Sequence, residues 1–270
     1  MRKYKVLTVW CAAAAALVAL RIYQLVSLTE YGTGFIKEGS HTAYIITSCA
    51  AAVITACVAV FAAAGVKGSK EHKEFHLVTS LCALAFGAAA AADVLVNKYA
   101  SAPQYVKIAC IFLGLLTAAF YALFAFRCAV HFPLSPKLAA IPVLFFVVKS
   151  VTVFIQGSYH VVISDTVIEV GVYAFTMLFL LEYARAVNGL SGKRSVQKIA
   201  AYGVCASLFS LLAAAKLIVA LIYPSALHDT AEGAVLPLFC GVYIASVLFT
   251  QLRFGANDDK VMGVYYSGKH

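Results

Sequence analysis

Three cationic side chains lie inside long apolar stretches, where they could bind an anion or pair with buried acids. They are Arg21, Lys149 and Lys216, the last in the middle of the stretch SLLAAAKLIVALIY. A charge at membrane depth costs at least a few kcal/mol unless it is paired, solvated or able to reach the interface. Each of the three is therefore expected to meet an acidic group or a charged ligand.

Acidic and amide side chains occur at similar depth. Asp165 and Glu169 are four residues apart and share a helix face, and Gln24 follows Arg21 on the same face. One interpretation is that these groups neutralise one another as interhelical pairs, or that the lysines extend outward to the interface. The other is a polar cavity with a net positive lining, open to the outside, that receives a small anionic or zwitterionic solute. The ligand-binding candidates are Arg21, Gln24, Asp93, Lys149, Glu169 and Lys216.

The composition indicates which elements position these residues. The 270 residues are 63% hydrophobic and only 12% charged, whereas a soluble domain carries about a quarter charged residues. An all-α, polytopic membrane protein is therefore predicted, with the lipid bilayer as its main partner. The net charge of +9 is interpreted as an orientation signal, and no nucleic acid is expected as a partner.

Apolar stretches of about 20 residues predict the transmembrane helices. The predicted spans are 6–28, 42–65, 76–97, 107–128, 138–157, 163–186, 198–223 and 233–252. The basic start of the chain resembles a signal peptide, but the apolar run continues past Arg21 to Leu28, which favours an uncleaved first helix. Pro142 and Pro237 lie inside spans and are expected to kink them.

Lysine and arginine residues in the connections predict the orientation. With the N-terminus inside, most of them fall on the cytoplasmic side, and those on the other side are Lys37, Lys98 and Lys107. Both termini are therefore predicted to be cytoplasmic, in the cell membrane, with an even number of helices.

Similar features recur at nearly constant spacing along the chain. Arg127 and Arg253 close the fourth and eighth spans, and Asp93 and Lys216 lie at repeat-equivalent positions, with Asp93 about one turn shallower. This pattern predicts two tandem four-helix repeats, 1–135 and 136–270, inserted in the same orientation within one compact membrane domain. It also makes Asp93 the first expected partner of Lys216.

Sequence motifs restrict the other function classes. The patterns HExxH, GxSxG, the P-loop and a helical DxxxD pair do not occur, so no enzymatic activity is predicted. A non-transporting membrane scaffold or sensor stays open as the alternative. A lysine in the seventh span, with an acid in the third, resembles microbial rhodopsins. The single tryptophan, Trp10, far from Lys216 in depth, and the cytoplasmic N-terminus argue against that class.

Cysteines and small residues are interpreted as packing groups. The eight cysteines lie in apolar runs or at their ends without a CxxC pair, and neither a metal nor a cofactor is predicted. His228, Asp229 and Glu232 could hold a metal at the outer rim, but a solvated loop is favoured. The small faces 12–16 and 87–92 suit close helix contacts within the chain, with a homodimer as the alternative.

The beginning of the chain carries one family resemblance. The pattern Leu20-Arg21-x-x-Gln24, followed by Thr33-Gly34-Phe35, resembles the opening of uncharacterised small polytopic membrane proteins of bacteria. The resemblance implies a bacterial cytoplasmic membrane and no known activity.

Overall fold

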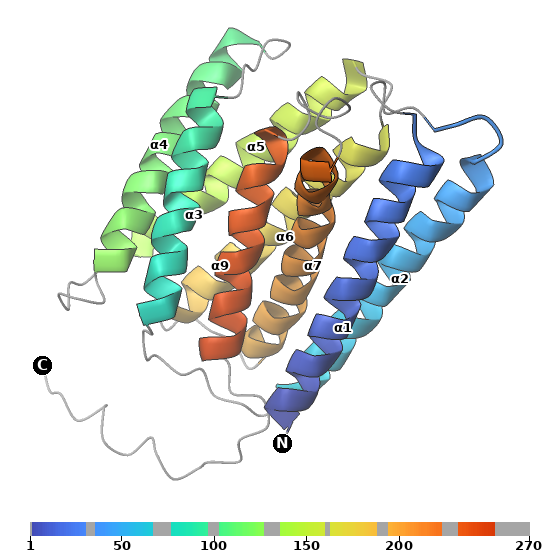
Figure 1. Cartoon of the computed structure of the whole chain (residues 1–270). Helices are drawn as coiled ribbons and strands as arrows, with labels where there is room; N and C mark the ends of the chain where they lie inside the picture. The colour runs from blue at the N-terminus through green and yellow to red at the C-terminus, as the bar shows by residue number, and fades with distance from the viewer. Residues whose placement is uncertain are drawn as a thin grey trace, which may run out of the picture.

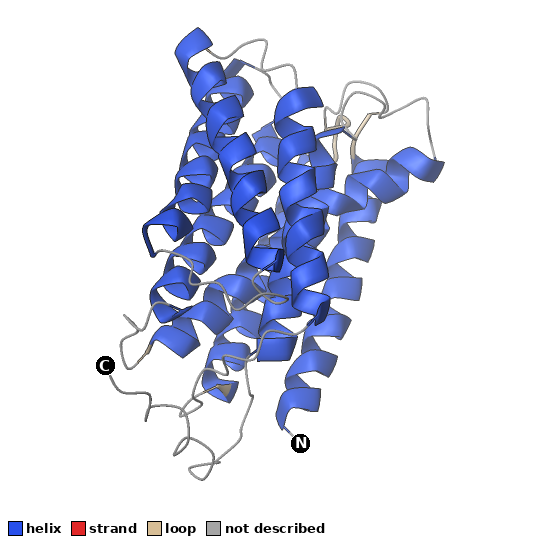
Figure 2. Cartoon of the chain, turned by 90° about the vertical axis from the view of Figure 1, so that its left-hand side faces the viewer, coloured by secondary structure: helices blue, strands red, loops and turns tan. Residues whose placement is uncertain are grey.

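A computed structural model describes eight stretches of the chain, and each contains one α-helix. The described residues are 2–30, 36–66, 77–96, 103–126, 136–159, 163–187, 194–222 and 232–251. The helices are α1 Arg2–Tyr23, α2 His41–Gly65, α3 Leu77–Val96, α4 Gln104–Phe126, α5 Ala140–Tyr159, α6 Ile163–Val187, α7 Ser195–Ile222 and α9 Val235–Gln251. Within these ranges no strand is present, and Figure 2 shows the helices packed side by side.

Seven of these helices are long and apolar enough to cross a membrane. The other, α9, is apolar but has 17 residues, so at 1.5 Å per residue it extends about 26 Å, near the lower limit for a span. The predicted all-helical, multi-pass architecture is confirmed at this level.

Several threonine hydroxyl groups inside the spans bond to a carbonyl of their own helix. Thr55 Oγ1 donates to the Ala51 carbonyl at 2.9 Å, and Thr117 Oγ1 donates to the Leu113 carbonyl at 2.7 Å. Lipid offers no hydrogen bonds, so each such bond removes an unsatisfied polar group from an apolar environment. These threonines therefore need no partner on another helix.

The two prolines lie at helix beginnings rather than in helix interiors. Pro142 is the third residue of α5, and Pro237 is the third residue of α9. In the first turn the missing N–H would have no intrahelical acceptor, so proline is tolerated there. A 3₁₀ turn precedes each of these helices, η2 Pro136–Ala139 before α5 and η3 Glu232–Ala234 before α9, and the expected kink stays a prediction.

Helix α7 lies at the centre of the arrangement. It packs against α1, α2, α6 and α9, while the α3–α4 hairpin packs against α9 and α5 on the opposite side (Figure 1). The first two helices thus contact a helix from the second half of the chain. Residues 1–135 and 136–270 together form one packed body, and their division into repeats stays a prediction.

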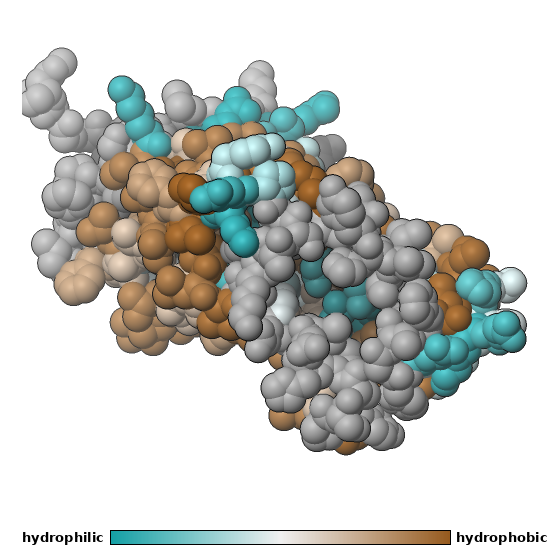
Figure 3. All heavy atoms as spheres, turned by 90° about the horizontal axis from the view of Figure 1, so that it is seen from above, coloured by the Kyte–Doolittle hydropathy of each residue, from teal (hydrophilic) through white to brown (hydrophobic). Residues whose placement is uncertain are grey.

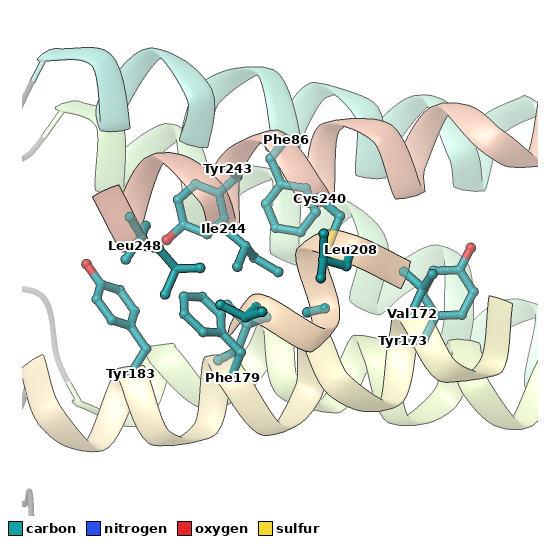
Figure 4. Packing of buried hydrophobic residues seen from close by; sticks show 14 of the residues in the cluster. Phe86, Val172, Tyr173, Phe179, Tyr183, Leu208, Cys240, Tyr243, Ile244 and Leu248 are labelled. Carbon is teal, nitrogen blue, oxygen red and sulfur yellow. The ribbon is translucent and has the colours of Figure 1, made fainter. Parts of the chain in front are cut away.

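The core contains an aromatic stack between α3, α5 and α9. The ring of Phe86 stacks on Tyr243 at 5.3 Å and on Phe146 at 5.9 Å between centroids. Figure 4 shows Tyr243, with its neighbours on α9, facing the side chains of α6. These buried rings hold the two sides of the bundle together by packing and offer no charged group.

Candidate functional site

Arg21 lies near the end of α1, where the helix passes into a π-helical segment, η1 Gln24–Leu28. Its side chain is 1% exposed. Nη1 donates to Gln24 Oε1 and to the Tyr44 hydroxyl, both at 2.9 Å, and Nη2 forms an ion pair with Asp165. Short π-helical segments occur frequently at functional sites. Through Tyr44 and Asp165, Arg21 links α1 to both α2 and α6.

Gln24 extends this network to α2. Its Nε2 group donates to Thr47 Oγ1 at 2.8 Å and to Ser48 Oγ at 3.2 Å, while its oxygen accepts from Arg21. Both ends of the amide are thus satisfied. The role of Gln24 is to orient the Arg21 guanidinium.

Lys216 meets two acids on α6. Its Nζ lies 3.0 Å from Asp165 Oδ2 and 3.2 Å from Glu169 Oε1. Together with Arg21 these residues form the charge cluster, defined here as Arg21, Asp165, Glu169 and Lys216. The expectation that Asp93 is the partner of Lys216 is wrong, because α7 packs directly on α6 and presents Lys216 to that helix.

Asp93 pairs with Lys149 instead. Lys149 Nζ lies 2.5 Å from Asp93 Oδ2, and the two side chains are 4% and 2% exposed. The same ammonium lies 5.9 Å from the centroid of the Tyr173 ring, within the range of a cation–π interaction. Of the six predicted candidates, Arg21, Glu169 and Lys216 therefore belong to the charge cluster, Gln24 is bonded to Arg21, and Asp93 and Lys149 form this separate buried pair.

The acids form the accessible side of the charge cluster. The Asp165 and Glu169 side chains are 20% and 22% exposed, whereas Lys216 is 6% exposed. They lie near the beginning of α6, and Figure 3 shows hydrophilic atoms on that face of the molecule. With two cations and two acids, the cluster is balanced, and the expected net positive lining is not what the structure presents.

Asp165 is the residue that the sequence-based choice of ligand-binding candidates omits. It contacts both cations and is the centre of the cluster. The spacing between Asp165 and Glu169 was the available signal, because residues four apart share a helix face. Thr47 and Ser48 carry no such signal, since serine and threonine hydroxyl groups in an apolar helix usually bond within the helix.

A second group of charges lies at the other end of α6. Glu182 Oε1 pairs with Arg185 at 3.3 Å and with Lys198 at 3.5 Å, and Glu182 Oε2 accepts from Ser195 Oγ at 3.3 Å. The pair of Glu182 and Arg185 lies within one helix, three residues apart, and Lys198 and Ser195 extend it to α7. Both cations are about half exposed, so this group is a surface link between helices with little energetic weight.

Metal-binding geometry is not present among the described residues, which hold no group of three or more His, Cys, Asp or Glu side chains able to share an ion. His228 and Asp229, together with the side chain of Glu232, lie outside the described part. The cysteines that the structure describes are free thiols. One of them, Cys240, lies 3.1 Å from Thr176 Oγ1 in the core.

No protein-family model, no curated protein and no solved structure matches this chain. The charge cluster is therefore the feature from which a function can be argued.

Proposed function

We propose that this multi-pass membrane protein binds a small anionic or zwitterionic solute at the charge cluster. The observation that carries the proposal is the layering of charge, in which partly accessible Asp165 and Glu169 lie in front of buried Arg21 and Lys216. A charged solute that reaches the two acids can replace the existing ion pairs of the cluster with its own contacts to the same side chains.

The energetic cost of the cluster supports a binding role. Removing an ion from water costs several kcal/mol, and apolar side chains of similar volume often replace a buried ion pair without loss of stability. Joining α1, α6 and α7 through four charges therefore costs more free energy than joining them through apolar contacts. Ionisable groups within spans commonly line solute or ion pathways.

The orientation follows from the distribution of lysine and arginine. We place both termini in the cytoplasm, so the charge cluster opens to the outside of the cell membrane. A transporter would in addition expose the cluster to the cytoplasmic end in a second conformation. Solute binding is the step that a transporter and a sensor share.

The alternative function, a scaffold whose charges are structural, draws on the other pair. Asp93 and Lys149 form a short ion pair with both side chains buried, which is suited to joining α3 to α5. We assign this pair a structural role and keep it apart from the proposed binding site.

The experiment compares two charge-neutral double variants of the purified protein in detergent. Thermal unfolding is measured with and without small carboxylates, phosphate and amino acids. In Lys216→Met with Glu169→Gln, one cation and one acid leave the cluster together, so the protein should fold but lose the rise in Tm caused by a ligand. Bound ligand at about 100 times Kd stabilises by about 2.7 kcal/mol in the parent.

The matched control is Asp93→Asn with Lys149→Met, which neutralises the buried pair in the same way. This variant should keep the ligand-induced rise in Tm. Retention of that rise in the cluster variant, or its equal loss in both variants, would contradict the proposed site.

A further inference from the structure

The charge cluster contains one buried donor that is not satisfied. Within the described part of the chain, Arg21 Nε has no hydrogen-bond partner, although the side chain is 1% exposed. Buried N–H groups of charged side chains are normally bonded, because leaving one unmade carries the full cost of its desolvation. An acceptor is therefore missing at this atom.

The position of the unsatisfied donor indicates what kind of acceptor fits. Nε and Nη2 form one edge of the planar guanidinium, and a carboxylate that binds this edge uses both oxygens. Asp165 does not, since Oδ1 faces Nη2 while Oδ2 lies 3.0 Å from Lys216. A second carboxylate could take both donors of the edge, and Asp165 would keep Lys216 as its partner.

The charge balance restricts the rest of the ligand. A carboxylate that joined the two cations and two acids of the cluster would leave one negative charge in excess. An ammonium group on the same molecule restores the balance, and the partly accessible acids can receive it. Lys216 Nζ already lies between Asp165 Oδ2 and Glu169 Oε1, so the ammonium of the ligand takes the other two oxygens, Glu169 Oε2 and the Asp165 Oδ1 that Arg21 releases.

We infer that the ligand is a small zwitterion with one carboxylate and one ammonium group, an inference that rests on the proposed solute-binding function. Its carboxylate binds the Nε and Nη2 edge of Arg21, and its ammonium binds Glu169 and Asp165.

The ligand class is tested by thermal unfolding with whole zwitterions and their halves. The probes are glycine, β-alanine and γ-aminobutyrate, compared with acetate, ethylammonium, an equal mixture of these two ions, and inorganic phosphate. At a concentration of about 100 times Kd, at least one zwitterion should raise Tm by about 5 °C or more. The single ions and their mixture should not, since they lack the covalent link between the charges.

The Arg21 edge is tested by Arg21→Lys, which keeps the positive charge but removes Nε–H and the planar fork. Affinity for the zwitterion, measured by calorimetry, should fall by about tenfold or more. Glu169→Gln tests the ammonium end independently and should weaken binding by a similar factor. The control is Lys198→Arg, which makes the reverse exchange of lysine and arginine at the end of α7 far from the charge cluster. It should leave the affinity unchanged.

The outcomes separate this inference from the function on which it rests. Stabilisation by acetate or phosphate as large as that by any zwitterion would overturn the ligand class while leaving solute binding in place. Unchanged affinity in both Arg21→Lys and Glu169→Gln would overturn the assigned contacts. If no probe of any class raises Tm, both the ligand class and the proposed function fail.

Discussion

At the residue scale, a buried lysine in an apolar helix needs a carboxylate within ion-pair distance, and the two buried lysines in the described part of the chain each have one. Lys149 faces Asp93 at 2.5 Å, whereas Lys216 is shared between Asp165 and Glu169 at 3.0 and 3.2 Å. The difference lies in access, because the acids of the second group are partly exposed. The first arrangement suits a permanent link, and the second suits exchange with a ligand.

The structural role of the buried pair leads to a prediction about stability. Lys149→Met removes the ammonium opposite the buried Asp93 carboxylate, so the free energy of unfolding should fall by about 3–5 kcal/mol. Combining it with Asp93→Asn should restore most of this loss, since no isolated charge is then buried. Unfolding in a denaturing detergent measures both. A single variant as stable as the double variant would show that the pair does not act as a link.

At the element scale, two hairpins are attached to the central helices in different ways. The α1–α2 hairpin is held to α6 by Arg21 and Asp165, and to α7 by Trp10 Nε1, which donates to Ser207 Oγ at 3.0 Å. The α3–α4 hairpin is held to α5 by Asp93 and Lys149 and to α9 by the stacking of Phe86 on Tyr243, and its own two helices approach each other closely. A Cβ added to Gly87 would lie 2.9 Å from Tyr121 Cβ and 3.2 Å from the Ala118 carbonyl oxygen.

Gly87→Ala should therefore separate α3 from α4. Alanine normally favours a helix over glycine by about 1 kcal/mol, but here the new methyl group meets the Ala118 backbone, which cannot rotate away. We expect a loss of about 1–3 kcal/mol in unfolding free energy.

Gly171→Ala is the control for this substitution. Its added Cβ would meet only the Phe209 ring, at 3.3 Å, and should change stability by less than about 1 kcal/mol. Equal effects of the two substitutions would mean that helix propensity, and not the α3–α4 contact, decides the result.

At the scale of the whole molecule, the proposed outward opening depends on the orientation of the bundle. The charge cluster lies near the beginning of α6, and the surface link of Glu182 lies near its end. If the termini are cytoplasmic, an outside solute reaches the cluster without crossing the membrane. If the orientation is reversed, the charge cluster faces the cytoplasm.

Reporter fusions test this orientation. Green fluorescent protein fused after His270 should fluoresce, because it folds in the cytoplasm, and alkaline phosphatase inserted in the connection 97–102 should be active outside. The exchanged pair, with each reporter at the other position, should be inactive. Activity of the exchanged pair alone would place the charge cluster on the cytoplasmic side.

The sequence by itself determined the membrane architecture. Apolar length is a local property, and a chain in lipid must satisfy its backbone within each helix, so composition predicts helices and their approximate bounds. The same local property marked Arg21, Asp93, Lys149 and Lys216 as unusual. The pair of Glu182 and Arg185 needs only such local information, since their three-residue spacing lies within one helix.

Only the tertiary structure decided which charges meet. Ion pairing between helices depends on which helices are neighbours, and α7 packs on α6 and α1 while α3 packs on α4 and α9. This arrangement brings Lys216 to Asp165 and Glu169 and leaves Asp93 to Lys149. Contacts between elements far apart in the chain leave no periodic signal, because spacing along a helix shows which residues share a face but not which helix packs against that face.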